Sequence, residues 1–328
     1  MTLSMMVIHT CGVAAVRVHV ANLEVSRAER LDQRVVAMLP QLSRASAVKL
    51  IEDKRVSVNG VSQTKPGYKL RPDDTVTVDY DPNREAQIPD IDLPVLYEDD
   101  DCVVISKPIG LLTHSKGAFN PEPTVGTWLR SHLTALPCES SALSHDLRER
   151  SFHSRAGIVH RLDRATSGVM ICAKTTEALS WLQKQFAQRR TKKTYLAIVQ
   201  GALSPAAAVI DMPIERNPKA PATFRVGAQG KTAQTAYRTI GSGNGYSLLE
   251  LRPVTGRTHQ LRVHLAHQQH PIVGDTMYGG EPAGRLYLHA LELELTLLHN
   301  HERKVFTAPV PPEFAALLAG KKGEHDSQ

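Results

Sequence analysis

Apolar residues recur at a helical spacing early in the chain. From about Arg27 they fall on one face of a predicted helix: Ala28, Leu31 and Val35. Ser26 and Glu29 have the spacing of a capping box, in which each side chain bonds backbone N–H groups at the helix start. Pro40 ends this helix, because proline lacks the N–H that a further turn requires.

A second helix and a small sheet are predicted downstream. Ser43 can cap the helix, which turns Val48 and Ile51 inward. Alternating valines then predict two strands: Val56 with Val58, and Val76 with Val78. Asn59-Gly60 after the first of them is a strong hairpin signal. The pattern predicts a small α/β domain at residues 22–80.

The region after residue 92 alternates short apolar runs with helical stretches. The runs predict strands: Cys102–Ser106, Val169–Ala173, Tyr195–Gln200 and Ser247–Val254. Thr176–Arg190 carries apolar residues on one helical face. Gly241–Gly245 lacks the spacing of a phosphate-binding loop and predicts a turn between two β-like runs. This mixture predicts an α+β domain built on a large sheet.

The chain is long enough for two domains. A single core stops growing at about 250–300 residues, and this chain has 328. Turn formers without periodicity predict a linker between the domains. We predict five segments: an N-terminal extension (1–21), the small domain (22–80), the linker (81–92), the large domain (93–315) and a flexible tail (316–328).

Composition excludes a membrane protein and leaves nucleic acid open as a partner. The residues are 41% hydrophobic and 22% charged, and no apolar run approaches the roughly 20 residues that span a bilayer. The four cysteines are scattered without paired spacing, which argues against a disulfide framework and favours a reducing cytoplasm. A net charge of +6 would attract a polyanion without demonstrating one.

Asp163 is the first candidate for chemistry. It lies at the entrance of a predicted strand between Arg161 and Arg164, which would favour the ionised carboxylate. A carboxylate held in this way can act as a nucleophile. The same residues also fit an ordinary loop salt bridge, with Thr166 or Ser167 serving a turn. Residue chemistry alone leaves both interpretations open.

Other candidates are ambiguous when taken alone. Lys107-Pro108 can be a strand-ending turn, and Tyr195 can be a packing residue. The basic residues 189–193 fit either a solvated helix end or a phosphate contact. Four histidines crowd one segment: His259, His264, His267 and His270. A metal site there is disfavoured, because no carboxylate or cysteine completes a familiar ligand spacing.

A nine-residue motif gives Asp163 a specific context. Residues 160–168 resemble the HRLD-x-x-T/S-S/T-G motif of RluA/RluD-type pseudouridine synthases, and three further blocks match that family in order: 101–111, 192–197 and 255–265. The resemblance implies an α+β pseudouridine synthase fold, with a large mixed, mainly antiparallel sheet flanked by helices and loops. It implies that Asp163 is the nucleophile and that Arg161 fills the space left by the flipped uridine.

The later blocks receive roles from the same resemblance. Tyr195 would lie against the target base and abstract a proton, and Leu261 would buttress it. Arg262 would pair with Asp163. We expect six residues to contact the substrate: Arg161, Leu261, His160, Lys107, Thr166 and His259. The base must leave its stack for the glycosidic bond to be broken and remade through carbon, and neither metal nor organic cofactor is required.

The small domain resembles the RNA-binding domain named after the fourth protein of the small ribosomal subunit. Residues 30–32, 42–44 and 54–60 match its pattern. Basic residues of this domain would contact phosphates without reading sequence: Arg30, Arg44, Lys49, Lys54 and Arg55.

Together the resemblances predict a monomeric, cytoplasmic isomerase acting on RNA. Large-subunit ribosomal RNA is the expected target, since the appended domain accompanies the ribosomal members, and transfer RNA is the alternative target. A non-catalytic RNA-binding or ribosome-assembly factor on the same fold is an alternative of another class. The intact Asp163, Tyr195 and Arg262 argue against that factor.

Overall fold

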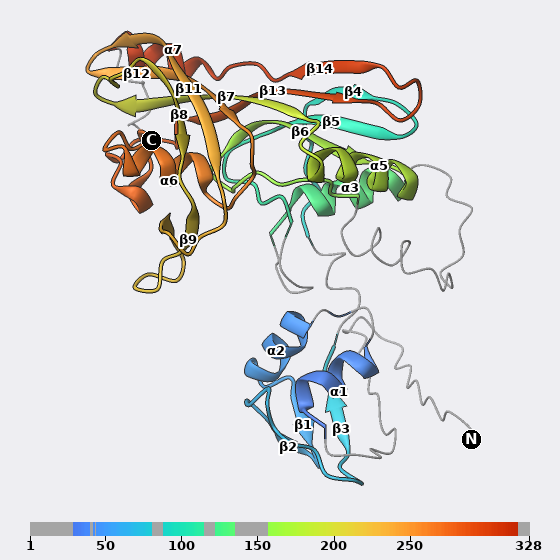
Figure 1. Ribbon diagram of the computed structural model, residues 1–328. Coiled ribbons are helices and arrows are strands. Elements are labelled where there is room, and N and C mark those ends of the chain that lie inside the picture. Colours follow the sequence, from blue (N-terminus) through green and yellow to red (C-terminus); the bar gives the residue numbers. More distant parts are fainter. Residues whose placement is uncertain are drawn as a thin grey trace, which may run out of the picture. The chain divides into compact units, whose positions relative to one another are not determined.

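The computed structural model describes residues 29–39, 42, 44–80, 88–114, 122–134 and 157–320. It divides into two compact units, residues 1–91 with 114–127 and residues 92–113 with 128–328, which are described separately (Figure 1). Several predicted features lie outside the described residues: the extension 1–21, Ser26, Arg27, Ala28, Pro40, Ser43 and most of the linker 81–92.

The first unit joins two helices and a three-stranded antiparallel sheet of order β2-β1-β3. Its elements are α1 (Leu31–Met38), α2 (Arg44–Glu52), β1 (Val56–Val58), β2 (Val61–Ser62) and β3 (Val76–Val78). Asn59 and Gly60 have φ angles of 52° and 79°, as a two-residue type I′ turn requires. Apolar residues of both helices, β1 and β3 share one core: Leu31, Val35, Leu50, Ile51, Val56, Val58, Val76 and Val78. These elements confirm the predicted α/β fold of this domain, and its bounds at residues 22 and 80 stay a prediction.

The first helix begins later than predicted. Arg30 forms an isolated β-bridge with Lys69, and the carbonyl of Glu29 accepts the N–H of Leu70. This pairing holds the chain extended through Arg30, so the helix starts at Leu31. The capping-box prediction for Glu29 is therefore wrong, because a tertiary strand contact replaces the first helical turn.

A nine-stranded sheet organises the second unit. The strands follow the order β4-β5-β6-β13-β7-β12-β11-β8, with β14 paired to β13 outside this path. Their bounds are β4 (Val95–Glu98), β5 (Cys102–Lys107), β6 (Ser167–Ala173), β7 (Lys192–Gln200), β8 (Ala207–Asp211), β11 (Gln234–Gly243), β12 (Tyr246–Pro253), β13 (Leu288–Thr296) and β14 (Arg303–Thr307). Neighbouring strands are antiparallel except for β6 with β13, which confirms the mixed, mainly antiparallel sheet.

Helices and a short hairpin complete the described elements. They are α3 (Val125–Thr134), α5 (Thr176–Ala187), α6 (Gln260–His267), the 3-10 helix η2 (Thr276–Tyr278), α7 (Pro312–Leu318), and the paired strands β9 (Ile214–Arg216) and β10 (Phe224–Val226). The hydroxyl of Thr175 accepts the N–H of Ala178 and caps α5. The last helix, α7, extends to Leu318, so folded chain continues into the tail predicted from residue 316.

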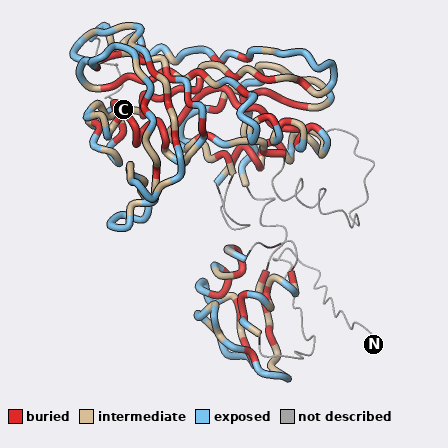
Figure 2. The backbone as a smooth tube through the Cα atoms, viewed as in Figure 1, coloured by how far each residue is buried: buried red, intermediate tan, exposed pale blue. Residues whose placement is uncertain are grey.

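The central strands form the core of the second unit. Figure 2 shows buried backbone concentrated along them, and every residue of β6 is buried. Because β6 is covered on both faces, its position in the sheet is fixed. The loop that carries Asp163 leads directly into this strand. None of the described helices is both long enough and apolar enough to span a membrane.

Gly168 sets the close approach of β6 to β13. Its φ is 120°, and a Cβ added there would overlap the backbone of Ala290 on β13. We expect Gly168→Ala to lower the free energy of unfolding by about 3 kcal/mol, from backbone strain and overpacking together. Gly245→Ala is the control, because Gly245 has a φ of 79° but open space around it, and should lose only about 1 kcal/mol. Equal losses in urea denaturation would contradict this account.

Candidate functional site

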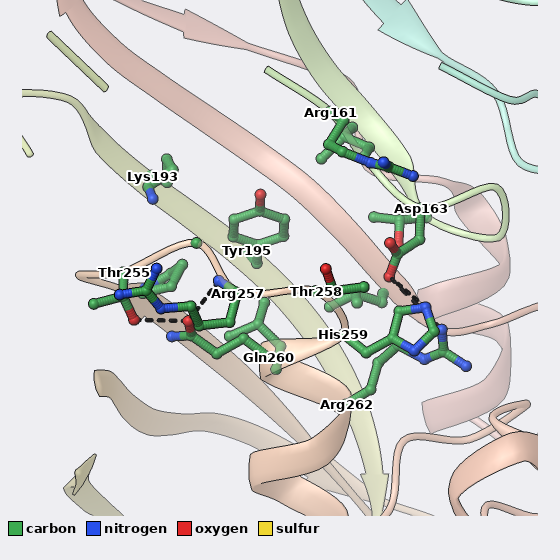
Figure 3. A pocket seen from close by; sticks show the side chains of 16 residues that line it. Arg161, Asp163, Lys193, Tyr195, Thr255, Arg257, Thr258, His259, Gln260 and Arg262 are labelled. Carbon is green, nitrogen blue, oxygen red and sulfur yellow. Dashed lines mark hydrogen bonds and ion pairs between the residues drawn. The ribbon is translucent and has the colours of Figure 1, made fainter. Parts of the chain in front are cut away.

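A pocket of about 130 Å³ opens between four segments of the second unit (Figure 3). The segments are the loop before β6, strand β7, the stretch that leads from β12 into α6, and the start of β13. They bring together most of the site residues predicted from the sequence: Arg161, Asp163, Thr166, Tyr195, His259, Leu261 and Arg262.

Asp163 lies between two residues whose backbone is tied down. The hydroxyl of Thr113 donates to the carbonyl of Leu162 at 2.8 Å and accepts the N–H of Leu162 at 3.2 Å. On the other side, the N–H of Gly110 donates to the carbonyl of Arg164 at 2.8 Å. Only 23% of the Asp163 side chain is exposed. Hydrogen bonds on both sides therefore restrict where the carboxylate can point.

Arg262 binds two carboxylates at different distances. Its Nε and Nη2 donate to the two oxygens of buried Asp275, each at 2.7 Å. Its Nη1 lies 3.6 Å from Oδ2 of Asp163. Burial alone would lower the pKa of the guanidinium, but the hydrogen bonds and charge of Asp275 raise it above its usual value. Arg262 thus reaches Asp163, while its tight partner is Asp275, which no sequence motif indicated as a site residue.

His259 faces the same carboxylate from a strained backbone position. It precedes α6 with a φ of 55°, in the left-handed region. Its Nδ1 lies 2.7 Å from the hydroxyl of Tyr278, which already accepts the N–H of Phe224. Burial lowers the pKa of His259 and favours the neutral ring. We infer that the Tyr278 hydroxyl donates to Nδ1, so Nε2 carries the proton and points it at Asp163 Oδ2, 3.8 Å away.

Tyr195 lies on β7 and lines the pocket beside Leu261. Leu261 is buried in the core cluster on which Tyr195 packs, an arrangement that suits the expected buttress. Burial raises the pKa of the Tyr195 phenol, and the negative charge of Asp163 raises it further. The phenol is therefore neutral at ordinary pH.

Lys107 lies behind the loop and does not line the pocket. Its side chain is fully buried, and burial lowers its pKa to about 8. Its ammonium donates to three carbonyls: Pro108 and Leu111 at 2.8 Å and Arg164 at 3.3 Å. These bonds let Lys107 brace the loop, and its substrate contact stays a prediction.

His160 also does not line the pocket, and its substrate contact stays a prediction. Its ring stacks on Phe186 with centroids 4.6 Å apart, and its Nε2 accepts the N–H of Ile171. Burial lowers the pKa of His160 to about 3, and the charge of Lys193 contributes. A neutral ring that bonds β6 is a structural support for the motif.

Three of the four crowded histidines, His259, His264 and His270, have separate hydrogen-bond partners. His264 lies 3.0 Å from the Thr235 hydroxyl and from the Met212 carbonyl, and His270 lies 2.8 Å from the carbonyl of Gln200. Within the described residues, no group of three or more His, Cys, Asp or Glu side chains could hold a metal ion.

Basic residues of the first unit differ in how they are held. Arg30 and Arg44 both bond Asp32, whose side chain is only 2% exposed, while 48% and 60% of their own side chains stay exposed. Lys49 pairs with Asp53, and Arg55 pairs with Asp79. Lys54 is exposed with a φ of 60°. Asp32 therefore holds two of the five predicted RNA contacts side by side.

The chain matches two protein-family models. Residues 101–267 match the family described as RNA pseudouridylate synthase, and residues 29–76 match the S4 domain. The first match contains all seven predicted site residues that line the pocket.

Relatives and solved structures agree with the first match. The proteins named ribosomal large subunit pseudouridine synthase D of Escherichia coli strain K12 and Nitrosomonas europaea are 35% and 37% identical, over 88% of this chain and 90% and 83% of their own lengths. The solved structure of human RNA pseudouridylate synthase domain containing 4 is 26% identical with a TM-score of 0.52, covering 68% of this chain and 90% of that one. The structure of human RNA pseudouridylate synthase domain containing 1 is 27% identical with a TM-score of 0.51, covering 70% and 87%.

Asp275 keeps the buried charge of Arg262 compensated. We expect Asp275→Asn to lower the free energy of unfolding by about 3 kcal/mol, because an unpaired buried cation remains. Adding Arg262→Met should recover much of this loss by removing that cation. Urea denaturation of both variants measures the effect, with exposed Asp211→Asn on β8 as the single-site control. A double variant no more stable than Asp275→Asn alone would show that the charge is not the cause.

Proposed function

This chain belongs to the RNA pseudouridylate synthase family, and from that premise we propose that it isomerises uridine in large-subunit ribosomal RNA with Asp163 as nucleophile. The pocket in which Asp163, Tyr195 and Arg262 converge is the observation that carries the proposal. The ribosomal target is supported by the names of relatives that align with most of this chain. The enzyme is an isomerase.

Base flipping is the first step that the pocket has to support. A uridine stacked in a helix cannot reach a carboxylate at the bottom of a pocket, and unstacking it costs a few kcal/mol. Arg161 is exposed at the pocket and can enter the gap that the base leaves. Phosphate contacts elsewhere on the strand would offset part of the cost.

Asp163 then acts on the ribose by one of two routes. As a nucleophile, its oxygen bonds C1′ while the C1′–N1 electron pair leaves with the uracil. In the other route, the carboxylate removes a proton from C2′ while the same bond breaks. Uracil turns within the pocket, and C5 bonds C1′. In the first route the Asp163–C1′ bond breaks as this bond forms and the carboxylate is released, and in the second route Asp163 returns the proton to C2′. The atoms balance and nothing is oxidised, so the reaction needs no cofactor.

Tyr195 is the proposed partner for the proton on C5. Because the pKa of the Tyr195 phenol is raised, the side chain is not ionised before the reaction and cannot act as a phenolate base. We propose that it relays the proton, giving up its own to water as it accepts the one from carbon. Arg262 and His259 orient the carboxylate, since both place a donor toward Asp163 Oδ2.

The S4 domain match supports RNA as the partner of the first unit. Arg30 and Arg44, held by Asp32, would contact successive phosphates. Lys49, Lys54 and Arg55 would add charge without reading sequence. We further propose a monomer, and a cytoplasmic location for which the scattered cysteines of the sequence are the supporting observation.

Replacing the nucleophile tests the chemistry and the target together. Pseudouridine mapping of total RNA would compare cells with the wild-type gene, a deletion, and Asp163→Asn. We expect deletion to remove specific pseudouridines from large-subunit ribosomal RNA and Asp163→Asn to restore none, because the amide is not an effective nucleophile. Restoration by the variant would overturn the role of Asp163, whereas losses confined to transfer RNA would overturn only the target.

Removing one phosphate contact should weaken RNA binding without sequence preference. We expect Arg44→Gln to reduce the slope of log affinity against log salt by about 1, because one fewer counterion is released. The matched control is Lys304→Gln on β14, where the ammonium lies over the Tyr97 ring. Filter binding across a salt series provides the measurement, and an unchanged slope for Arg44→Gln would remove Arg44 from the RNA contacts.

A further inference from the structure

Lys193 lines the pocket from the same strand as Tyr195. The two residues are two positions apart on β7, so their side chains leave the same face of the sheet. Lys192, the preceding residue, points the other way: its side chain is 72% exposed and pairs with Glu294 at 3.1 Å. The adjacent lysines therefore occupy different environments.

The described residues leave the positive charge of the Lys193 ammonium without a counter-charge. Among the described residues it has no hydrogen bond or ion pair, and the charged neighbour that most affects it is another cation, Arg189. Burial lowers the pKa of Lys193, and Arg189 lowers it further. A desolvated cation without a carboxylate is costly to keep, and such groups concentrate where a ligand supplies the missing charge.

The position of Tyr195 indicates which part of the substrate arrives there. In Figure 3, Tyr195 lies between Lys193 and Asp163. If Asp163 acts on the ribose and the base lies against Tyr195, the edge of the base remote from the sugar points toward Lys193. That edge carries the exocyclic oxygen O4. The phosphates belong nearer the pocket mouth, where Arg161 is exposed, because the strand has to continue outside.

We propose that Lys193 binds an exocyclic oxygen of the flipped uracil and stabilises the uracilate anion that forms as the C1′–N1 bond breaks. The inference rests on the proposed function of the pocket and adds a catalytic residue to it. The electron pair of the broken bond stays on the uracil and spreads onto its oxygens, whether Asp163 bonds C1′ or removes the C2′ proton. A fixed cation at the oxygen is strongest when that charge has developed, so it accelerates bond cleavage.

Single-turnover kinetics at saturating RNA test the proposal. Full-length Lys193→Met should cleave the glycosidic bond about 10²-fold more slowly than wild type, with RNA affinity changed by less than about twofold. Lys192→Met is the matched control and should react at the wild-type rate. Wild-type rates for Lys193→Met would overturn the proposal, and weaker binding with a normal saturated rate would assign Lys193 to a phosphate instead.

A substrate with a better leaving group separates charge stabilisation from a folding defect. Fluorine at C5 withdraws electrons and stabilises the uracil anion, so the enzyme's cation should matter less. We expect the ratio of wild-type to Lys193→Met cleavage rates to shrink severalfold on RNA carrying 5-fluorouridine, measured as its loss from nucleoside digests. An equal ratio on both substrates would overturn the proposal. If wild-type enzyme cleaves neither RNA, the proposed function fails rather than the role of Lys193.

Discussion

The division of Arg262 between two carboxylates is the interaction on which the pocket depends. A buried guanidinium needs a close counter-charge, and Asp275 supplies it through two bonds of 2.7 Å. Asp163 is left at 3.6 Å, close enough to be attracted and not bound in a tight fork. If Asp163 were the bidentate partner, its oxygens would be occupied and less able to react. Asp275 therefore makes a positioned yet available carboxylate possible.

The fold supplies the rigidity that this arrangement needs. Asp163 stands at the entrance of β6, a strand buried along its whole length. The loop before it is held by Thr113 on one side and by Gly110 and Lys107 on the other. Because these anchors bond backbone carbonyls, they fix the path of the loop independently of the side chains that face the pocket. The support and the chemistry are thereby carried by different residues.

Sequence patterns predicted the elements better than the contacts between them. The strands at β5, β6, β7 and β12 followed from short apolar runs, and the turn at Asn59-Gly60 followed from turn chemistry. Strand β13 was missed although leucine alternates with glutamate along it, a readable signal for a half-buried strand. Lys107 and His160 were expected at the substrate from their motifs, and neither lines the pocket, because a motif gives proximity in sequence and not the direction of a side chain. Asp275 was missed since only the fold brings it to Arg262.

The charged residues of the pocket are arranged to match the charges that develop during the reaction. Breaking the glycosidic bond leaves the ribose short of electrons and the uracil with an extra pair. At one end of the pocket stands a carboxylate, Asp163, and on the far side of Tyr195 in the same view stands the ammonium of Lys193. A neutral uridine is stabilised little by these two charges before it reacts. The positive charge that develops on the ribose and the negative charge that develops on the uracil are stabilised most. The proposed roles of Asp163 and Lys193 thus belong to one electrostatic design, in which the pocket favours the transition state over the bound nucleoside.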